Sequence, residues 1–192
     1  MAGLFAAILL RSRGWDPHVY ERASEALANR GAGIVTHNVL YDAVRAAGIE
    51  LRDEMGVPSL GRVVFDASGA VIGKLDMPQI MTSWGLIYRF LRAQIPDSHY
   101  HHGHTLVGLD THGERVHAAF DNGARAAGDW LIGADGSRST VRRLVAPEVR
   151  FDYCGYFVWR GLFDETRIDP AVLTQVANQL ALNMAPGGHW LG

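Results

Sequence analysis

The first 21 residues constrain the fold most, because they place a strongly apolar helix directly before a short strand. Residues 2–13 are rich in Ala and Leu and stop before Gly14, as expected of a helix and its C-terminal end. Residues 18–21 are β-formers that close on the acidic Glu21. A helix that leads directly into a strand indicates an α/β fold, and a helix this apolar must be buried on most of its sides.

Gly3 and Glu21 have the spacing of a dinucleotide-binding unit, because Glu21 lies 18 positions after Gly3. In that unit a glycine-rich turn lets the backbone approach a pyrophosphate at a helix N-terminus. An acid about 20 residues further on accepts hydrogen bonds from the ribose. Gly3 fits the last glycine of such a turn. A solvated glutamate at a strand end, with no ligand, is the alternative for the same two residues.

The rest of the chain continues the mixed pattern of helices and strands. Helices are expected at residues 37–47, 83–92, 140–144 and 169–179, with Ser83 as a helix cap. Strands are expected at residues 62–65, 71–75, 104–109, 115–120, 129–132, 153–163 and 180–184. A four-residue turn at 66–69 predicts a hairpin. The pattern indicates an α/β chain with an interleaved sheet, and not two tidy sequential domains.

Composition excludes several classes of function. The formal net charge of −2 gives no general attraction to nucleic acid, so we expect no nucleic-acid partner. The single cysteine, Cys154, excludes an internal disulfide or a CxxC pair. The longest apolar run, residues 3–10, falls well short of the roughly 20 residues that span a bilayer. Arg11 and Arg13 follow this run, the wrong order for a secretory signal, so we expect a cytoplasmic protein.

A second candidate site lies in residues 129–142, DWLIGADGSRSTVR. An apolar strand delivers Asp135 and Gly136 into a loop, and a short helix rich in Ser and Arg follows. Gly136 allows close approach of the backbone, and Asp135 can accept a hydrogen bond from a sugar or from a donor on the nicotinamide side. Arg138 and Arg142 add positive charge. The alternative is an ordinary Asp-Gly turn with a helix N-cap.

The string GADGSRSTVR resembles the Asp-Gly motif of the class A flavoprotein monooxygenases, the aromatic hydroxylases of the para-hydroxybenzoate hydroxylase type. The start, AGLFAAILLRSRGWDPHVYER, is similar to the FAD-binding helix and ribose-binding strand of that family. RGAGI at 30–34 resembles its loop over the flavin, and SWGLIYRFLR at 83–92 its helix with a flavin-contacting arginine. YFVWRGLFDE at 156–165 resembles the dihydroxypyridine-hydroxylase-like branch.

The resemblance implies cofactor-binding roles for eight residues: Gly3, Glu21, Arg22, Gly31, Ala32, Gly33, Arg89 and Asp135. It places Gly3 under the pyrophosphate and Glu21, with Arg22 beside it, at the adenosine ribose. It places the backbone of 31–33 near the isoalloxazine side, and Arg89 near the ribityl and pyrophosphate groups. Asp135 would serve both FAD and NAD(P)H.

The resemblance also implies an enzyme that uses FAD and NAD(P)H, with a small aromatic substrate and O₂ as partners. In this family the reduced flavin captures O₂ as a C4a-hydroperoxide that hydroxylates an electron-rich aromatic or pyridinol ring. The cofactor performs the chemistry, so no catalytic side chain and no metal are expected. The alternative is a truncated, non-catalytic fragment or an interaction module on the same fold.

The implied fold is an incomplete, Rossmann-like FAD-binding domain interleaved with a β-rich, substrate-side sheet. The first strand and the opening Gly-x-Gly of the family are absent before Met1, which would explain why the apolar start has nothing to pack on. We expect residues 1–150 to form the FAD-binding domain, with inserted β segments around 61–80. Residues 151–192 would begin the sheet of the substrate domain.

Two further patterns predict structure and not chemistry. The histidines of 99–104 suggest a metal site, but no acidic residue follows them until Asp110, so we expect a polar strand pair whose charge changes near pH 6.5. The aromatic run of 153–163 is expected to form core and sheet surface, with Cys154 buried in the same strand.

Overall fold

The computed structural model describes residues 1–25, 27, 33–50, 55–150, 152–159, 161 and 164–191. Its helices are α1 (Ala2–Arg11), α2 (Asn38–Ala46), α3 (Trp84–Arg92), α4 (Thr140–Val145) and α5 (Pro170–Val176), with single 3-10 turns η2 (Asp97–His99) and η3 (Glu165–Arg167). Its strands are β1 (Val19–Tyr20), β2 (Gly33–Val35), β3 (Val57–Phe65), β4 (Val71–Ser83), β5 (Tyr100–His101), β6 (Leu106–His112), β7 (Arg115–Phe120), β8 (Arg125–Gly128), β9 (Gln179–Ala185) and β10 (Gly188–Leu191). The predicted mixture of helices and strands is therefore confirmed.

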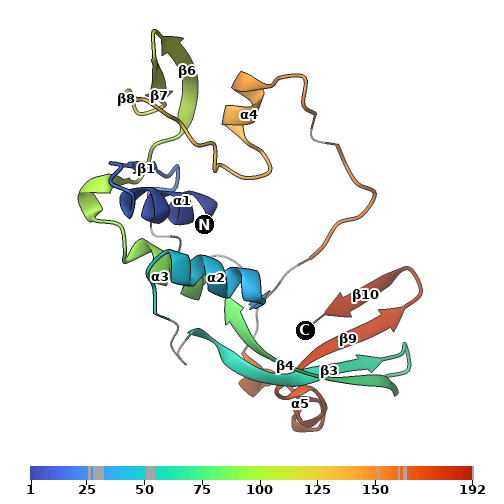
Figure 1. The fold of residues 1–192 in the computed structure, drawn as a ribbon. Coiled ribbons are helices and arrows are strands. Elements are labelled where there is room, and N and C mark those ends of the chain that lie inside the picture. Colours follow the sequence, from blue (N-terminus) through green and yellow to red (C-terminus); the bar gives the residue numbers. More distant parts are fainter. Residues whose placement is uncertain are drawn as a thin grey trace.

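The main core lies where α1, α2 and α3 pack together, in the middle of Figure 1. Helix α3 forms where the sequence predicts it, because Ser83 Oγ accepts a hydrogen bond from the N–H of Leu86 at 3.1 Å. Helical spacing then turns one face of each helix inward. The buried residues of this core are Leu4, Ala7, Ile8, Val44, Ala47, Ile49, Met55, Ile87, Tyr88, Leu91, Ile95 and Tyr100.

A parallel pair of short strands, β1 and β5, borders this core. Val19 pairs with Tyr100, and Tyr20 pairs with His101. Val19 packs partly buried against the helices, and Tyr100 is buried among them. The pairing fixes what lies at each end of the two strands, with His18 and His99 before them and Glu21 and His102 after them.

A five-stranded sheet joins two distant parts of the chain in the order β10-β9-β3-β4-β2. The hairpin from β3 to β4 turns at 66–69 as predicted, where Asp66 Oδ1 accepts from the N–H groups of Ser68 and Ala70. Strand β9 pairs in parallel with β3, and Val63 and Ala181 are partners in a small second core. Residues 57–83 and 179–191 therefore share one sheet, shown at the bottom of Figure 1. The division into domains at residue 150 stays a prediction.

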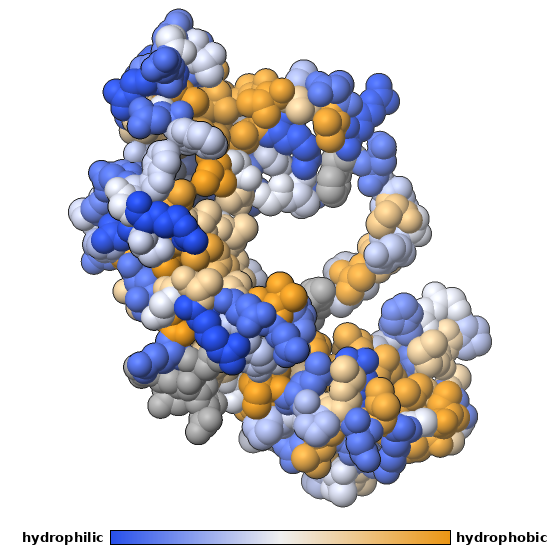
Figure 2. All heavy atoms as spheres, in the orientation of Figure 1, coloured by the Kyte–Doolittle hydropathy of each residue, from blue (hydrophilic) through white to orange (hydrophobic). Residues whose placement is uncertain are grey.

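A separate antiparallel sheet of β6, β7 and β8 stands at the top of Figure 1. The chain then passes through residues 129–139 to α4. A long connection follows from α4 to α5. Figure 2 shows apolar side chains at the surface of this connection and of the five-stranded sheet. None of the helices that the structure describes has the length and apolarity needed to cross a membrane.

Two predicted strands are wrong. Residues 129–132 pair with no strand in the described part of the chain, and Trp130 is 77% exposed. The described residues of 153–163 also form no ladder, and Trp159 is 88% exposed. Cys154, expected to be buried, is exposed. Both segments carry strand-forming side chains, but a strand also needs a hydrogen-bonded neighbour, which these segments lack among the described residues.

Candidate functional site

Two predicted site segments meet at the N-terminal end of α1. A Cβ built on Gly3 would lie 3.2 Å from the Cβ of Ala134, so the first turn of α1 touches the loop that carries Asp135. The same segment also follows α1 at its other end, where the rings of Trp15 and Trp130 pack edge to face at 6.3 Å between centroids. Residues 130–134 thus run alongside α1 and bring the Asp-Gly loop to its N-terminus.

Glu21 joins this end of α1 from the strand side. Its backbone N–H donates to the carbonyl of His101 at 2.8 Å, and its carbonyl accepts from the N–H of His104 at 3.0 Å. The carboxylate atom Oε1 accepts from the N–H of Ala23 at 2.9 Å. Among the described residues no donor is bonded to Oε2, which is therefore available to accept a hydrogen bond from a ligand.

The N-terminus of α1 is suited to an anionic group. Strand β1 packs against α1, and Glu21 follows β1. Burial lowers the pKa of the Met1 amine, and the negative charge of Glu21 opposes that effect. The residue before the helix makes no side-chain cap to the first turn. A helix start of this kind carries a partial positive charge and uncommitted N–H donors, which suit an anionic group such as a phosphate.

Asp135 is held in a defined orientation by the start of α4. Its Oδ1 accepts from the hydroxyl of Ser139 at 2.5 Å, and its Oδ2 accepts from the N–H groups of Thr140 and Val141 at 2.6 and 3.1 Å. Burial opposes ionisation, but these hydrogen bonds outweigh it and lower the pKa of Asp135. The helix-cap alternative thus describes the contacts that Asp135 makes within the chain, while its role toward a cofactor stays a prediction.

Glycine is required in the same loop for packing. A Cβ on Gly133 would lie 2.9 Å from Val141 Cγ1, closer than real Cβ atoms approach, and Gly136 has a φ of +82° that disfavours other residues. Ser139 is a contributor that the sequence interpretation missed. It contacts Asp135 and also caps α4 by accepting from the N–H of Arg142 at 2.9 Å. The four-residue spacing of Asp135 and Ser139 before a helix is the signal that points to it.

The other predicted site residues lie away from this point. Gly33 begins β2 and pairs with Ser83, the residue that caps α3. Arg89 is exposed on α3, and Arg22 is exposed after β1. Neither guanidinium has a hydrogen bond or ion pair within the described ranges. Helix α3 packs against α1. The junction where β2 meets the start of α3 therefore borders the same two helices as Gly3 and the Asp135 loop. Gly31 and Ala32 lie outside the described residues.

Comparisons with known proteins match this chain to an FAD-binding family. The family model described as "FAD binding domain" matches residues 1–152. The chain is 35% identical over 191 residues to 2,6-dihydroxypyridine 3-monooxygenase from Paenarthrobacter nicotinovorans, covering 98% of this chain and 47% of that protein. It is 32% identical over 193 residues to 3-amino-4-hydroxybenzoate 2-monooxygenase from Streptomyces cremeus, covering 90% of this chain and 48% of that protein.

A solved structure is also similar over nearly the whole chain. The structure of 2,6-dihydroxypyridine-3-hydroxylase from Arthrobacter nicotinovorans matches with a TM-score of 0.89 at 33% sequence identity, covering 98% of this chain and 48% of that one. The chain therefore spans about half the length of the relatives it matches. The agreement confirms that the mixed α/β fold is that of FAD-binding domains.

Proposed function

Because the chain belongs to the FAD-binding class A flavoprotein monooxygenases, we propose that it is the N-terminal part of an NAD(P)H-using enzyme that hydroxylates an aromatic or pyridinol ring. The observation that carries the proposal is the meeting of Gly3, Glu21 and the Asp135 loop at the start of α1. The Asp135 loop reaches this helix end from more than 100 positions further along the chain.

The residues present fit the adenosine and pyrophosphate half of FAD. Glu21 has one carboxylate oxygen already fixed by Ala23 and a second, Oε2, available for a ribose hydroxyl. The first turn of α1 offers backbone N–H donors and a positive dipole end to the pyrophosphate. Gly3 keeps that turn close to Ala134, a spacing that a larger residue would widen.

The remaining assignments rest on the family resemblance and on exposure. Arg89 is an exposed cation with no partner within the described ranges, which suits a role at the ribityl and pyrophosphate groups. Arg22 is likewise exposed beside Glu21. Asp135 would orient both FAD and NAD(P)H through the loop that it rigidifies. Gly31, Ala32 and Gly33 would approach the ring side of the cofactor.

The chemistry would be divided between cofactor and protein. When bound, FAD supplies the redox chemistry, accepting hydride from NAD(P)H and activating O₂. The residues of this chain bind and orient the cofactor, and we assign no catalytic side chain and no metal to the hydroxylation. The two curated relatives named above are called a dihydroxypyridine and an aminohydroxybenzoate monooxygenase, so we propose a hydroxylated aromatic or pyridine ring as substrate.

We also propose that the Rossmann-like fold is completed by sequence outside residues 1–192. Residues 129–134 lie along α1 in the place where a strand is expected, yet they have no ladder partner among the described residues. A strand preceding α1 would supply that partner. The remainder of the substrate-side sheet would supply cover for the exposed aromatic residues of 153–159.

FAD binding tests the proposal with a matched pair of variants. We expect FAD titrated into the full chain to bind, with Glu21→Gln at least about ten-fold weaker, because a charge-assisted hydrogen bond contributes about 1.5–3 kcal/mol. Glu25→Gln makes the same change of charge at an exposed position four residues away and should bind as the wild type does. Equal binding by both variants would contradict the assignment of Glu21.

Turnover separates the proposal from its alternative. In the presence of FAD, NAD(P)H, O₂ and 2,6-dihydroxypyridine, the proposed enzyme consumes NAD(P)H and hydroxylates the ring. A non-catalytic fragment or interaction module would bind FAD without consuming NAD(P)H, and the coverage of about half of each relative favours keeping it as the second candidate. The assay should be run on the full chain and on any longer protein that contains it.

A further inference from the structure

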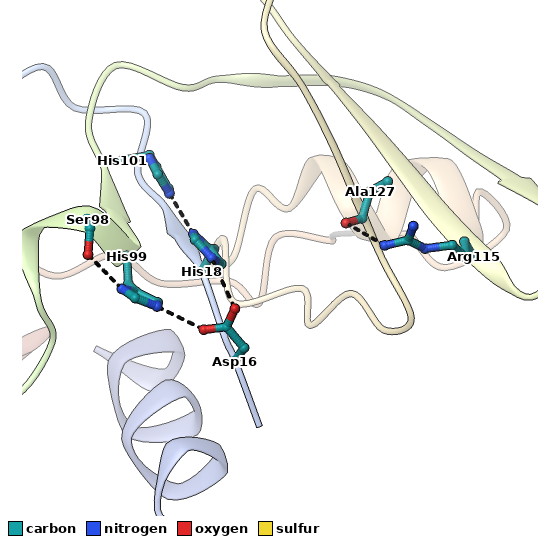
Figure 3. Close-up of polar contacts among 7 residues, drawn as sticks. All are labelled: Asp16, His18, Ser98, His99, His101, Arg115 and Ala127. Atoms are coloured by element: carbon teal, nitrogen blue, oxygen red, sulfur yellow. Dashed lines mark hydrogen bonds and ion pairs between the residues drawn. The ribbon is translucent and has the colours of Figure 1, made fainter. Parts of the chain in front are cut away.

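A cluster of metal-ligating side chains lies outside the cofactor site, at the start of β1 and β5. Asp16, His18 and His99 each offer one ligand atom, and these atoms lie within 4.8 Å of one another. Figure 3 shows the Asp16 carboxylate beside the rings of His18 and His99, with a dashed line to each ring. Glu21, by contrast, follows β1 at its other end. The cluster is therefore distinct from the ribose-binding position.

The fold brings these three residues together from distant sequence positions. The parallel pairing of Val19 with Tyr100 sets the preceding residues, His18 and His99, side by side. Their rings stack with centroids 4.6 Å apart and an interplanar angle of 22°. Asp16 comes from the loop after α1 and reaches His99 across 83 sequence positions.

In each of the two rings, Nδ1 faces an outer partner and Nε2 faces the Asp16 carboxylate. The Nδ1 atom of His99 lies 2.9 Å from Ser98 Oγ, and the Nδ1 atom of His18 lies 2.9 Å from His101 Nε2. Both partners can accept a hydrogen bond, so each Nδ1 can carry the proton of a neutral ring. In that tautomer each Nε2 presents a lone pair to an ion, which takes the place of the proton that His99 Nε2 donates to Asp16 Oδ1 in the ion-free chain. A metal-bound histidine has this same arrangement, with its second nitrogen donating to an outer partner.

The Nε2 atoms converge on Asp16 at distances that suit a small divalent ion. His99 Nε2 lies 2.8 Å from Asp16 Oδ1, and His18 Nε2 lies 3.8 Å from Asp16 Oδ2. Zinc-to-ligand bonds of about 2.0–2.2 Å place the ligand atoms of a tetrahedral site about 3.3 Å apart. The two observed distances, to the two different oxygens of the carboxylate, lie on either side of that value. The three ligand atoms lie within 4.8 Å of one another, so the side chains would draw together around an ion.

We propose that Asp16, His18 and His99 bind a divalent transition-metal ion, with Zn²⁺ the best match to two imidazoles and one carboxylate. Three protein ligands leave one tetrahedral position for water. Such an ion would tie the loop after α1 to the start of β5. Ser98 and His101 are positioning residues that orient the two ligand rings.

Calorimetric titration of ZnCl₂ into the untagged, chelator-treated full chain tests the proposal. We expect one Zn²⁺ per chain. Asp16→Asn and His99→Gln should each weaken zinc binding at least ten-fold, because changing even an outer partner of a metal ligand typically costs roughly 10–100-fold in affinity. Ser98→Ala, which changes such an outer partner, should weaken binding less than the two ligand variants. The Asp16 side chain is 78% exposed, so Asp16→Asn should leave the fold intact, as circular dichroism can verify.

His112→Gln is the matched control. His112 also pairs with an aspartate, its Nε2 lying 2.6 Å from Asp110 Oδ2 on an exposed strand, but it belongs to no three-residue cluster in the described part of the chain. Unchanged zinc binding in this variant supports the site. Absence of zinc binding by the wild type would overturn the proposal. Equal affinity in wild type and Asp16→Asn, or an equal loss in His112→Gln, would also overturn it.

Discussion

Replacing Gly3 by Val tests whether the Asp-Gly loop packs on the first turn of α1. A Cβ at this position would already lie 3.2 Å from the Ala134 Cβ, against about 3.5–4.0 Å for an optimal carbon contact, and the two methyl groups of valine add further crowding. Overpacking of this kind destabilises a protein by about 1–3 kcal/mol. The higher helix propensity of valine offsets a few tenths of a kcal/mol of that. We therefore expect a net loss of about 1–2 kcal/mol.

Urea unfolding followed by circular dichroism measures this loss. Ala2→Val is the matched control, because Ala2 is exposed on the same helix and should lose no more than about 0.7 kcal/mol in helix propensity. Ala134→Gly should restore part of the stability of Gly3→Val, because it removes the atom that the new side chain meets, with a coupling energy of about 0.5–3 kcal/mol. Equal stability of Gly3→Val and Ala2→Val, with no coupling to position 134, would refute the packing of the loop on α1.

Three other substitutions probe separate parts of the structure. Asp135→Asn should destabilise the chain at neutral pH. Hydrogen bonds lower the folded-state pKa of Asp135, so the stabilisation that its carboxylate gives is present above the ordinary pKa of about 3.9 and is lost as the pH falls through the folded pKa. Urea unfolding should therefore show a difference in stability from the wild type that shrinks in acid. Ser83→Ala removes the cap of α3 and should lower the free energy of unfolding by about 1 kcal/mol, while Ser68→Ala at the exposed turn should lower it less. Val63→Ala removes two buried methyl groups next to Ala181 and should lower the free energy of unfolding by about 2 kcal/mol, seen as one shifted thermal transition. A separate, earlier transition would show that the sheet holding β3 and β9 does not unfold cooperatively with the helical core.

Local signals in the sequence predicted local structure well. The helix at 84–92 and the turn at 66–69 formed as expected, because a cap and an Asx turn are decided by residues a few positions apart. The cofactor-binding roles of the site residues stay predictions. Gly3, Glu21 and Asp135 each sit in a recognisable local pattern, and the structure brings their segments to one end of α1.

Pairing between distant segments was not predictable from the sequence. The strand-forming residues of 129–132 and 153–159 lack a partner among the described residues, so their composition alone gave the wrong answer. The parallel pairing of β3 with β9 and the meeting of Asp16 with His99 depend on tertiary contacts. After the histidine run the sequence offers no acidic residue until Asp110, whereas the fold supplies Asp16, which lies 83 positions before His99.

A crystal structure of the full chain grown with FAD tests the central claim most directly. The account predicts the adenosine ribose within hydrogen-bond distance of Glu21 Oε2, and the pyrophosphate at the N-terminus of α1 beside Gly3. Well-defined FAD bound elsewhere, with neither Glu21 nor the first turn of α1 in contact with it, would contradict the account.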